Sequence, residues 1–292
     1  MRSSKKEIIL LLIPQFIMTL FLITGILNGL LQSFGVMPSV GLLQPTFAYY
    51  QEVLSSSMTL RSLFFSLWLA FASTLLSGGI GLWICYLFIN QDQLPGWVQR
   101  IIRIPIIVPH IVVALFIILL FTPTGWFARI FYAVGFENIQ NFFRYWVFDP
   151  YGNGIILGYL WKEIPFVIFF TLALMRQIDT SLGEAAQTLG ASRFQSFLHV
   201  TLPLCKKTIV SALFIIFMFT FSAYEMPALL GPTLPKSLPE LAYIEYTHPD
   251  FANRPYAMAI NGLILIISLI ISLIFFYWSE YSSKKEKKNE KK

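Results

Sequence analysis

Charged residues are scarce in this sequence. Asp, Glu, Lys and Arg make up 12% of its 292 residues, roughly half of the share of about 25% that soluble domains carry. Hydrophobic residues make up 56%, and the mean hydropathy is +0.67. Apolar runs of about 18 residues or more recur, and each is long enough to cross about 30 Å of hydrocarbon. The composition excludes an ordinary soluble core and predicts an all-α, polytopic membrane helix bundle.

The chain also lacks the residue patterns of common enzyme and metal sites. Its two cysteines, Cys85 and Cys205, have no Cys-x-x-Cys partner, so no disulfide framework is expected. The three histidines, His110, His199 and His248, do not have the spacing of metal ligands. Neither the phosphate-binding pattern Gly-x-x-x-x-Gly-Lys-Ser/Thr nor the nucleophile elbow Gly-x-Ser-x-Gly occurs. We expect no catalytic residue, no metal and no cofactor in this chain.

Six apolar segments can be drawn as membrane spans. Lys and Arg indicate their orientation, because cytoplasmic segments are enriched in both. With the N-terminus inside, the cytoplasmic segments hold fifteen of these residues and the outside segments hold five. Both termini are therefore predicted to be cytoplasmic, and the net charge of +6 reflects membrane flanks and the Lys-rich tail rather than nucleic-acid binding. The predicted spans, in a single domain of residues 1–292, are 8–31, 62–88, 104–121, 155–175, 208–229 and 257–278.

A moderately polar segment, residues 176–207, separates the fourth and fifth spans. Ser181 and Glu184 have the spacing of a capping box, which predicts the start of a short helix. Gly190 supplies the backbone freedom for a turn after this helix. A second helix is predicted from about Ser192, and Pro203 either ends it or kinks the chain before the fifth span. Its apolar positions follow helical spacing and predict one apolar face: Phe194, Phe197, Leu198 and Thr201.

This segment resembles the cytoplasmic coupling loop of permease subunits of binding-protein-dependent ABC importers. The resemblance rests on the spacing of Glu184-Ala185-Ala186, Gly190 and Val200-Thr201-Leu202-Pro203, with Val200 where Ile is commoner. Residues 104–114 and 161–166 also look like the permeases of the polyamine, iron(III), thiamine and sulfate importers. The coupling residues that the resemblance implies are Glu184, Ala185, Ala186, Gly190, Leu202 and Pro203. A simpler role for Glu184, helix capping alone, stays open.

The resemblance implies the partners and the location of the chain. It implies a type I importer permease fold in the inner membrane of a prokaryote, surrounded by lipid. ATP hydrolysis is expected on separate ABC ATPase subunits that bind the coupling loop. A second permease subunit, with a heterodimer favoured, and an extracytoplasmic solute-binding protein complete the implied assembly. One motif is misleading: residues 76–79, Leu-Ser-Gly-Gly, match the core of the ABC ATPase signature but lie in an apolar span, where small residues favour close helix packing.

Three ionisable residues lie within or near the predicted spans, where charge is costly and functional roles are common. Lys162 and Glu163 fall in the fourth span, and Glu225 falls near the outer end of the fifth. We interpret them as candidates for the translocation path. The alternatives are a structural ion pair with another helix, a lysine that reaches the interface, and, for Glu225, a place in the membrane interface.

The substrate is the least determined property. Acidic residues near a path favour a cation such as a polyamine, while iron(III), thiamine, phosphonate and sugar stay open as alternatives. A function of another class, an ion-coupled secondary carrier, would need intramembrane acids without a docking loop. The presence of the loop favours the ATP-driven importer.

Overall fold

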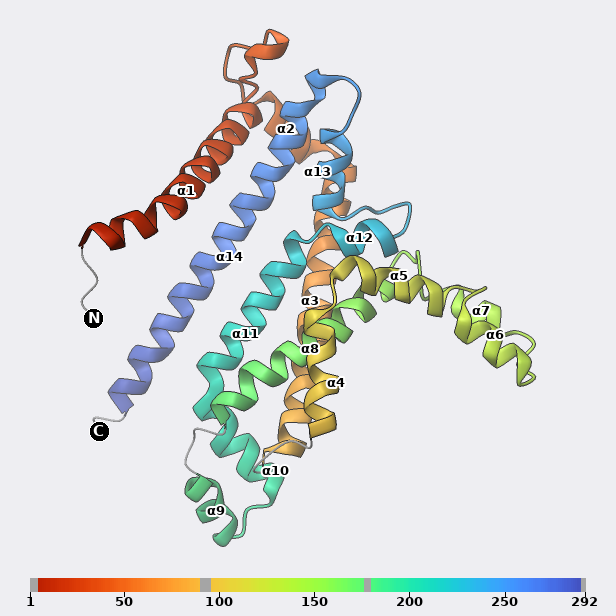
Figure 1. Cartoon of the computed structure of the whole chain (residues 1–292), viewed down its shortest axis with the longest axis vertical. Coiled ribbons are helices and arrows are strands. Elements are labelled where there is room, and N and C mark those ends of the chain that lie inside the picture. The colour runs from red at the N-terminus through yellow and green to blue at the C-terminus, as the bar shows by residue number, and fades with distance from the viewer. Residues whose placement is uncertain (1–4, 90–95, 176–179, 290–292) are drawn as a thin grey trace. The chain divides into compact units, whose positions relative to one another are not determined.

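The computed structural model describes residues 5–89, 96–175 and 180–289, and their regular structure is helical apart from one isolated bridge between Met37 and Leu42 (Figure 1). This confirms the predicted all-α class. The long elements are α1 (Lys5–Ser33), α3 (Ser57–Phe88), α4 (Gly96–Ile107), α5 (His110–Phe121), α8 (Asn153–Met175), α11 (Leu202–Ser222) and α14 (Arg254–Asn289). The short ones are α2 (Ala48–Ser55), α6 (Trp126–Ala133), α7 (Ile139–Phe143), α9 (Thr180–Thr188), α10 (Arg193–Ser196), α12 (Glu225–Leu230) and α13 (Leu238–Tyr246).

Within the described ranges, six helical stretches are long and apolar enough to cross a membrane. Their number agrees with the sequence prediction, and each has the length that about 30 Å of hydrocarbon requires. The structure thus has the architecture of a polytopic helix bundle. The six stretches are Leu10–Ser33, Ser57–Phe88, His110–Ala133, Asn153–Ala173, Arg193–Ser222 and Phe251–Tyr281.

The third predicted span, 104–121, differs from the structure because its helix is broken. α4 ends at Ile107 and α5 begins at His110, with Pro109 in an extended conformation at ψ 148° between them. Proline has no N–H to donate and disfavours helical backbone at the residue before it. Pro105 and Pro165, in contrast, lie inside helices that continue through them.

The fifth predicted span, 208–229, is also divided differently. α11 begins six residues earlier than predicted, at Leu202, and ends at Ser222, because the backbone of Ala223 is extended. A separate short helix, α12, then begins at Glu225. Glu225, which the sequence places near the outer end of the fifth span, is thus the first residue of α12, three residues after the end of α11.

The chain divides into two compact units, Met1–Leu60 with Leu241–Ile267 and Arg61–Glu240 with Ser268–Lys292. In the first unit α1 lies beside the early part of α14 at Gly29, where an added Cβ would lie 3.8 Å from the sulfur of Met258, an ordinary van der Waals distance. The hydroxyl of Tyr50 on α2 donates a hydrogen bond of 2.9 Å to Ser33 at the end of α1. α1 thus contacts α2 and α14 near its C-terminal end, while its side chains at residues 10–28 are exposed.

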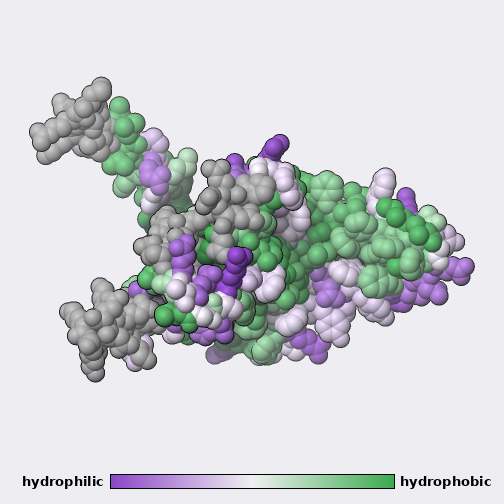
Figure 2. Space-filling view, turned by 90° about the horizontal axis from the view of Figure 1, so that it is seen from below, coloured by the Kyte–Doolittle hydropathy of each residue, from purple (hydrophilic) through white to green (hydrophobic). Residues whose placement is uncertain are grey.

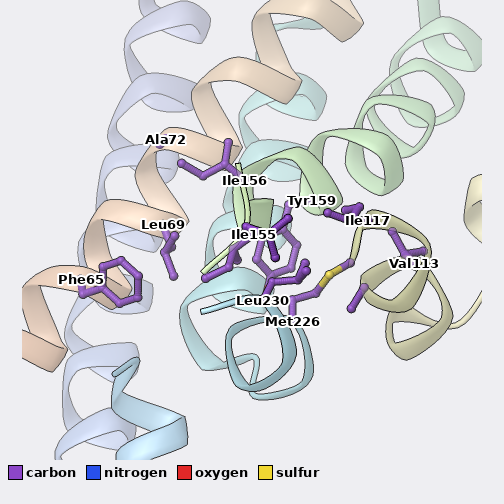
Figure 3. Close-up of a cluster of buried hydrophobic side chains, with 12 residues drawn as sticks. Phe65, Leu69, Ala72, Val113, Ile117, Ile155, Ile156, Tyr159, Met226 and Leu230 are labelled. Carbon is purple, nitrogen blue, oxygen red and sulfur yellow. The ribbon is translucent and has the colours of Figure 1, made fainter. Parts of the chain in front are cut away.

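The second unit contains two buried apolar clusters. The first joins α3, α5, α8 and α12, and Figure 3 shows its side chains pointing toward one another around Tyr159 and Ile155. The second, which we call the lower core, joins α3, α4, α8, α11 and the turn before α11. Its buried members are Cys85, Val98, Ile168, Leu172, Met175, Phe197, Cys205 and Ile209.

Two glycines of α3 allow close helix approach in this unit. A Cβ added at Gly78 would lie 2.6 Å from a methyl carbon of Leu213 on α11. A Cβ added at Gly81 would lie 2.7 Å from a methyl carbon of Val167 on α8. The Leu-Ser-Gly-Gly sequence that mimics an ATPase signature thus lies at a packing contact between helices, as its apolar surroundings predict.

Membrane topology stays a prediction that cysteine labelling can test. Cys85 and Cys205 are fully buried, so the wild-type chain should give little background with an impermeant thiol reagent. Thr233 is exposed in the segment predicted to lie outside, whereas Ser237 nearby is only 1% exposed and is a poor labelling position. We expect the reagent, added to intact cells, to label Thr233→Cys and not Ser283→Cys in the tail. The reverse pattern would contradict two cytoplasmic termini.

Candidate functional site

The predicted turn at Gly190 is present in the structure. Gly190 has a φ of +97°, in the left-handed region that side chains rarely adopt. Its N–H donates to the carbonyl of Gln187 at 2.9 Å, and the N–H of Ala191 donates to the carbonyl of Ala186 at 3.0 Å. These two bonds form a Schellman motif, which satisfies the last carbonyls of α9 and ends the helix.

The capping box lies at a different position from the predicted one. Ser181 is already within the helical residues of α9, and its side chain lies outside the described part of the structure. A capping box is present at α10 instead. The Ser192 hydroxyl accepts from the N–H of Gln195 at 3.2 Å, and the Gln195 side chain accepts from the N–H of Ser192 at 2.8 Å. The spacing of Ser192 and Gln195 is itself a sequence signal for this box.

One hydrogen bond that the sequence did not predict holds α9 against α10. The hydroxyl of Ser196 donates to the carbonyl of Gly183 at 3.1 Å, and Ser196 is buried. A Cβ at Gly183 would lie 3.3 Å from this hydroxyl oxygen. The two short helices therefore form one structural piece, which we call the helix pair; α9 and α10 are labelled near the lower edge of Figure 1.

The helix pair continues directly into α11. Residues Arg193–Ser222 form one uninterrupted helical stretch, with a π-helical segment at Phe197–Thr201. Pro203 lies in the first turn of α11 and does not end the helix. Pro203 has no N–H to donate to the carbonyl four residues before it. The π turn lies just before Pro203, and in it the N–H of Leu202 donates to the carbonyl of Phe197, five residues earlier. Leu202 and Pro203, which the resemblance implies as coupling residues, thus lie at the start of α11, directly after the π-helical segment.

The surface of the helix pair mixes polar and apolar side chains. Glu184 and Ala185 are exposed and Ala186 is half-buried. The predicted apolar face of the second helix is divided, because Phe197 packs into the lower core while Phe194 and Leu198 are exposed. Figure 2 views this end from below and shows hydrophilic residues with smaller hydrophobic patches among them. Exposed large apolar side chains suit a surface that another protein covers. Leu182 and Phe194 are such side chains on the helix pair, Leu189 follows α9, and Leu198 lies in the adjoining π-helical segment.

Lys162 and Glu163 lie inside the second unit, on α8, and each is only 8% exposed. The ammonium group of Lys162 donates to the backbone carbonyl of Val108 at 2.5 Å. Val108 lies at the break between α4 and α5, where carbonyls lose their helical partners and the negative end of the α4 dipole is directed at a cation. Lys162 therefore stabilises the broken third span, which supports the structural alternative for this residue.

Glu225 lies near enough to polar side chains of other helices for its charge to affect them. Its charge acts on His110 at the start of α5 and on Tyr159 and Lys162 of α8. Glu225 is exposed, whereas His110 Nε2 and the Tyr159 hydroxyl are buried polar atoms for which no hydrogen-bond partner is found among the described residues. Glu163 acts on Tyr159 and Lys162 as well, so all three predicted path residues belong to one group with a histidine and a tyrosine. In the described ranges no cluster of three His, Cys, Asp or Glu side chains could hold a metal ion.

Comparison with known proteins places this geometry in a family. A family model described as "Binding-protein-dependent transport system inner membrane component" matches residues 91–284. Sulfate permease 2, chloroplastic, of Chlamydomonas reinhardtii is 29% identical over 146 residues, which are 49% of this chain and 37% of that protein. The sulfate transport system permease protein CysT of Escherichia coli (strain K12) is 23% identical over 236 residues, which are 79% of this chain and 80% of that protein.

A solved structure shares the fold. The crystal structure of a bacterial ABC transporter involved in the import of the acidic polysaccharide alginate contains a chain that superposes with a TM-score of 0.74 at 21% identity. The likeness covers 94% of this chain and 95% of that chain. This agrees with the fold that the sequence resemblance implies, and the family model covers more than half of the chain. The chain therefore belongs to the family of inner-membrane components of binding-protein-dependent transport systems, and the sequence resemblance to ABC importer permeases is confirmed.

Proposed function

We propose that this chain translocates a small solute that an extracytoplasmic binding protein delivers, and that separate ABC ATPase subunits bind the helix pair and drive the cycle. The observation that carries the proposal is the helix pair itself. It is internally fixed by the Ser196–Gly183 bond, carries exposed apolar side chains and continues without interruption into α11. Short helices with apolar side chains are the usual elements that dock into a groove of a partner.

The partner subunits follow from this proposal. The solved structure with the shared fold is an ABC transporter, which supports the proposal of separate ATPase subunits. We also propose a second permease subunit, with a heterodimer favoured, as the sequence resemblance implies. An ion-coupled carrier is the weaker alternative, because membership of this family leaves it without support. The test is reconstitution in lipid nanodiscs with the cognate ATPase subunits and binding protein from the same organism. We expect a stable complex whose ATP hydrolysis rises when the binding protein is added; an ATPase that neither binds nor responds would contradict the proposal.

For the translocation path we propose Glu163 and Glu225, and we assign Lys162, next to Glu163 on α8, a structural role. Lys162 is engaged with the Val108 carbonyl, so the carboxylates are the charges left for a solute. Carboxylates favour a cation, which supports the polyamine that the sequence suggests. The names of the two relatives, both sulfate permeases, support an oxyanion instead. Thermal-shift measurements on the cognate binding protein with spermidine, sulfate, thiamine, ferric ion and a phosphonate would decide between them.

Glu225 offers a direct test of a cationic substrate. We expect Glu225→Gln to lower the uptake of labelled spermidine by about twofold at roughly 150 mM salt and by more at roughly 10 mM. The Debye length is about 8 Å at the higher salt and about 30 Å at the lower, so the charge of Glu225 is screened less at low salt. Glu137→Gln, at another exposed acid of the same unit, is the control and should not change the salt dependence. Equal uptake by Glu225→Gln and wild type at both salt concentrations would remove Glu225 from the path.

A further inference from the structure

Four aromatic rings join the lower end of α3 to the helix pair. Trp83 and Tyr86 come from α3, Phe194 comes from α10 and Phe197 comes from the π-helical segment. The Tyr86 ring lies at the centre, with its centroid 5.6 Å from Trp83, 5.5 Å from Phe194 and 5.3 Å from Phe197. Trp83 also contacts Phe194 directly, at 6.5 Å. We call these four residues the aromatic cluster.

The geometry of the aromatic cluster is specific. Tyr86 meets Phe194 edge to face at 84° and meets Phe197 tilted at 57°. The edge-to-face arrangement is preferred over a face-to-face sandwich because the ring edge is positive and the ring face negative. A rotation of α10 relative to α3 would change both contacts together. The aromatic cluster therefore fixes an orientation and does not merely fill space.

The aromatic cluster is buried on the side of Phe197 and exposed on the side of Trp83 and Phe194. Phe197 is buried in the lower core and Tyr86 is half-buried beside it, whereas Trp83 is 55% and Phe194 46% exposed. The cluster thus connects the interior of the bundle to the surface that carries the exposed side chains of the helix pair. Through Phe197 it also reaches α11, and through the Ser196–Gly183 bond α10 is fixed to α9.

We propose that the aromatic cluster is a positioning element that transmits movement of the helix pair to α3, so that α3 and α11 shift together when an ATPase subunit displaces α9 and α10. This inference rests on the proposed function. The covalent chain links the helix pair to α8 and α11, whereas α3 is far from it in sequence. α3 packs on α8 and α11 through Gly81 and Gly78, and the rings of Trp83 and Tyr86 contact Phe194 of α10 directly. Tyr86 is the central positioning residue because it contacts the other three rings.

The experiment uses nanodisc complexes with the cognate ATPase subunits and binding protein from the same organism. The readout is the ratio of ATP hydrolysis with binding protein to hydrolysis without it. We expect Tyr86→Leu to retain the ATPase subunits and the basal rate but to lose about fivefold or more of this ratio, the lower range of ordinary coupling factors between sites. Tyr86→Phe keeps the ring and should retain the wild-type ratio. Phe71→Leu, at an exposed aromatic of the same helix, is the control and should change nothing.

Each outcome has a defined meaning. A wild-type ratio in Tyr86→Leu overturns the positioning role. Absence of ATPase binding or stimulation in the wild-type complex contradicts the proposed function and is separate from any effect of Tyr86. If Tyr86→Leu does not insert, the exposed pair decides: Trp83→Leu and Phe194→Leu should each lower the ratio, and the double variant should fall no further than the larger single effect. Independent, additive losses would overturn the proposal.

Discussion

Gly190→Asp is expected to insert into the membrane normally and to lose most of its transport activity, about tenfold or more. A Cβ at Gly190 has no neighbour within 4 Å in this chain, so a side chain there meets only a docked partner. It would place a charge and new volume on the turn of the helix pair, and a loss of only about 1.4 kcal/mol in docking free energy is already tenfold in affinity. Ala186→Asp, one turn earlier, should act in the same direction.

Backbone strain is the competing explanation, and the chain contains a matched control for it. Gly135 has a φ of +103° and, like Gly190, open space where a Cβ would be. Gly135→Asp should therefore carry a similar left-handed strain, roughly 1–2 kcal/mol, while leaving uptake and ATPase co-purification unchanged. Uptake of labelled spermidine and labelled sulfate, each normalised to the amount of inserted protein, provides the measurement. Wild-type uptake by Gly190→Asp would falsify the docking role of the turn.

A second large effect is expected at the packing contact between α3 and α8. A Cβ at Gly81 would lie 2.7 and 2.8 Å from two carbons of Val167 and 3.5 Å from the backbone oxygen of Ile164. Because Val167 is branched and fully buried, it cannot rotate away, and the helices must separate. Gly81→Ala should destabilise the protein by about 1–3 kcal/mol, the usual cost of overpacking, and Gly81→Val should cost more.

Gly79, two residues earlier on the same helix, is the matched control. A Cβ at Gly79 has no neighbour within 4 Å, and alanine is favoured over glycine inside a helix by roughly 1 kcal/mol. Gly79→Ala should therefore be neutral or stabilising, so the same substitution is expected to have opposite signs at the two positions. Thermal unfolding of the purified protein in detergent, followed by tryptophan fluorescence, compares the two variants. Equal melting temperatures would show that α3 and α8 do not pack through Gly81.

Local features of the helix pair could be predicted from the sequence, because they depend on residues near one another. Gly190 after a helical segment predicts a left-handed turn, and that turn is present. Ser181 and Ser192 both precede a Glu or Gln by three residues, and the two positions give the same sequence signal. Only the structure shows that Ser192 forms the capping box.

Features that depend on tertiary contacts could not be predicted. Pro109 interrupts the third span while Pro165 leaves α8 continuous, although the two residues carry the same local penalty. The difference lies in the surroundings, since Lys162 from another helix binds the carbonyl that the break at Val108 leaves free. The Ser196–Gly183 bond and the rings around Tyr86 likewise join residues whose proximity no local pattern indicates.

The π-helical segment at Phe197–Thr201 has a consequence for how the chain tolerates changes in length. A π turn is equivalent to one extra residue in an α-helix, and each residue rotates the helix by about 100°. The π segment already absorbs its extra residue within the continuous helix Arg193–Ser222. Removing a single residue from it would restore a regular α turn and leave α10, with Phe194, close to its present direction relative to α11. The same deletion in the regular part of α11 would rotate the docking surface by the full angle, so the π segment is the place in this helix where a change of length is tolerated best.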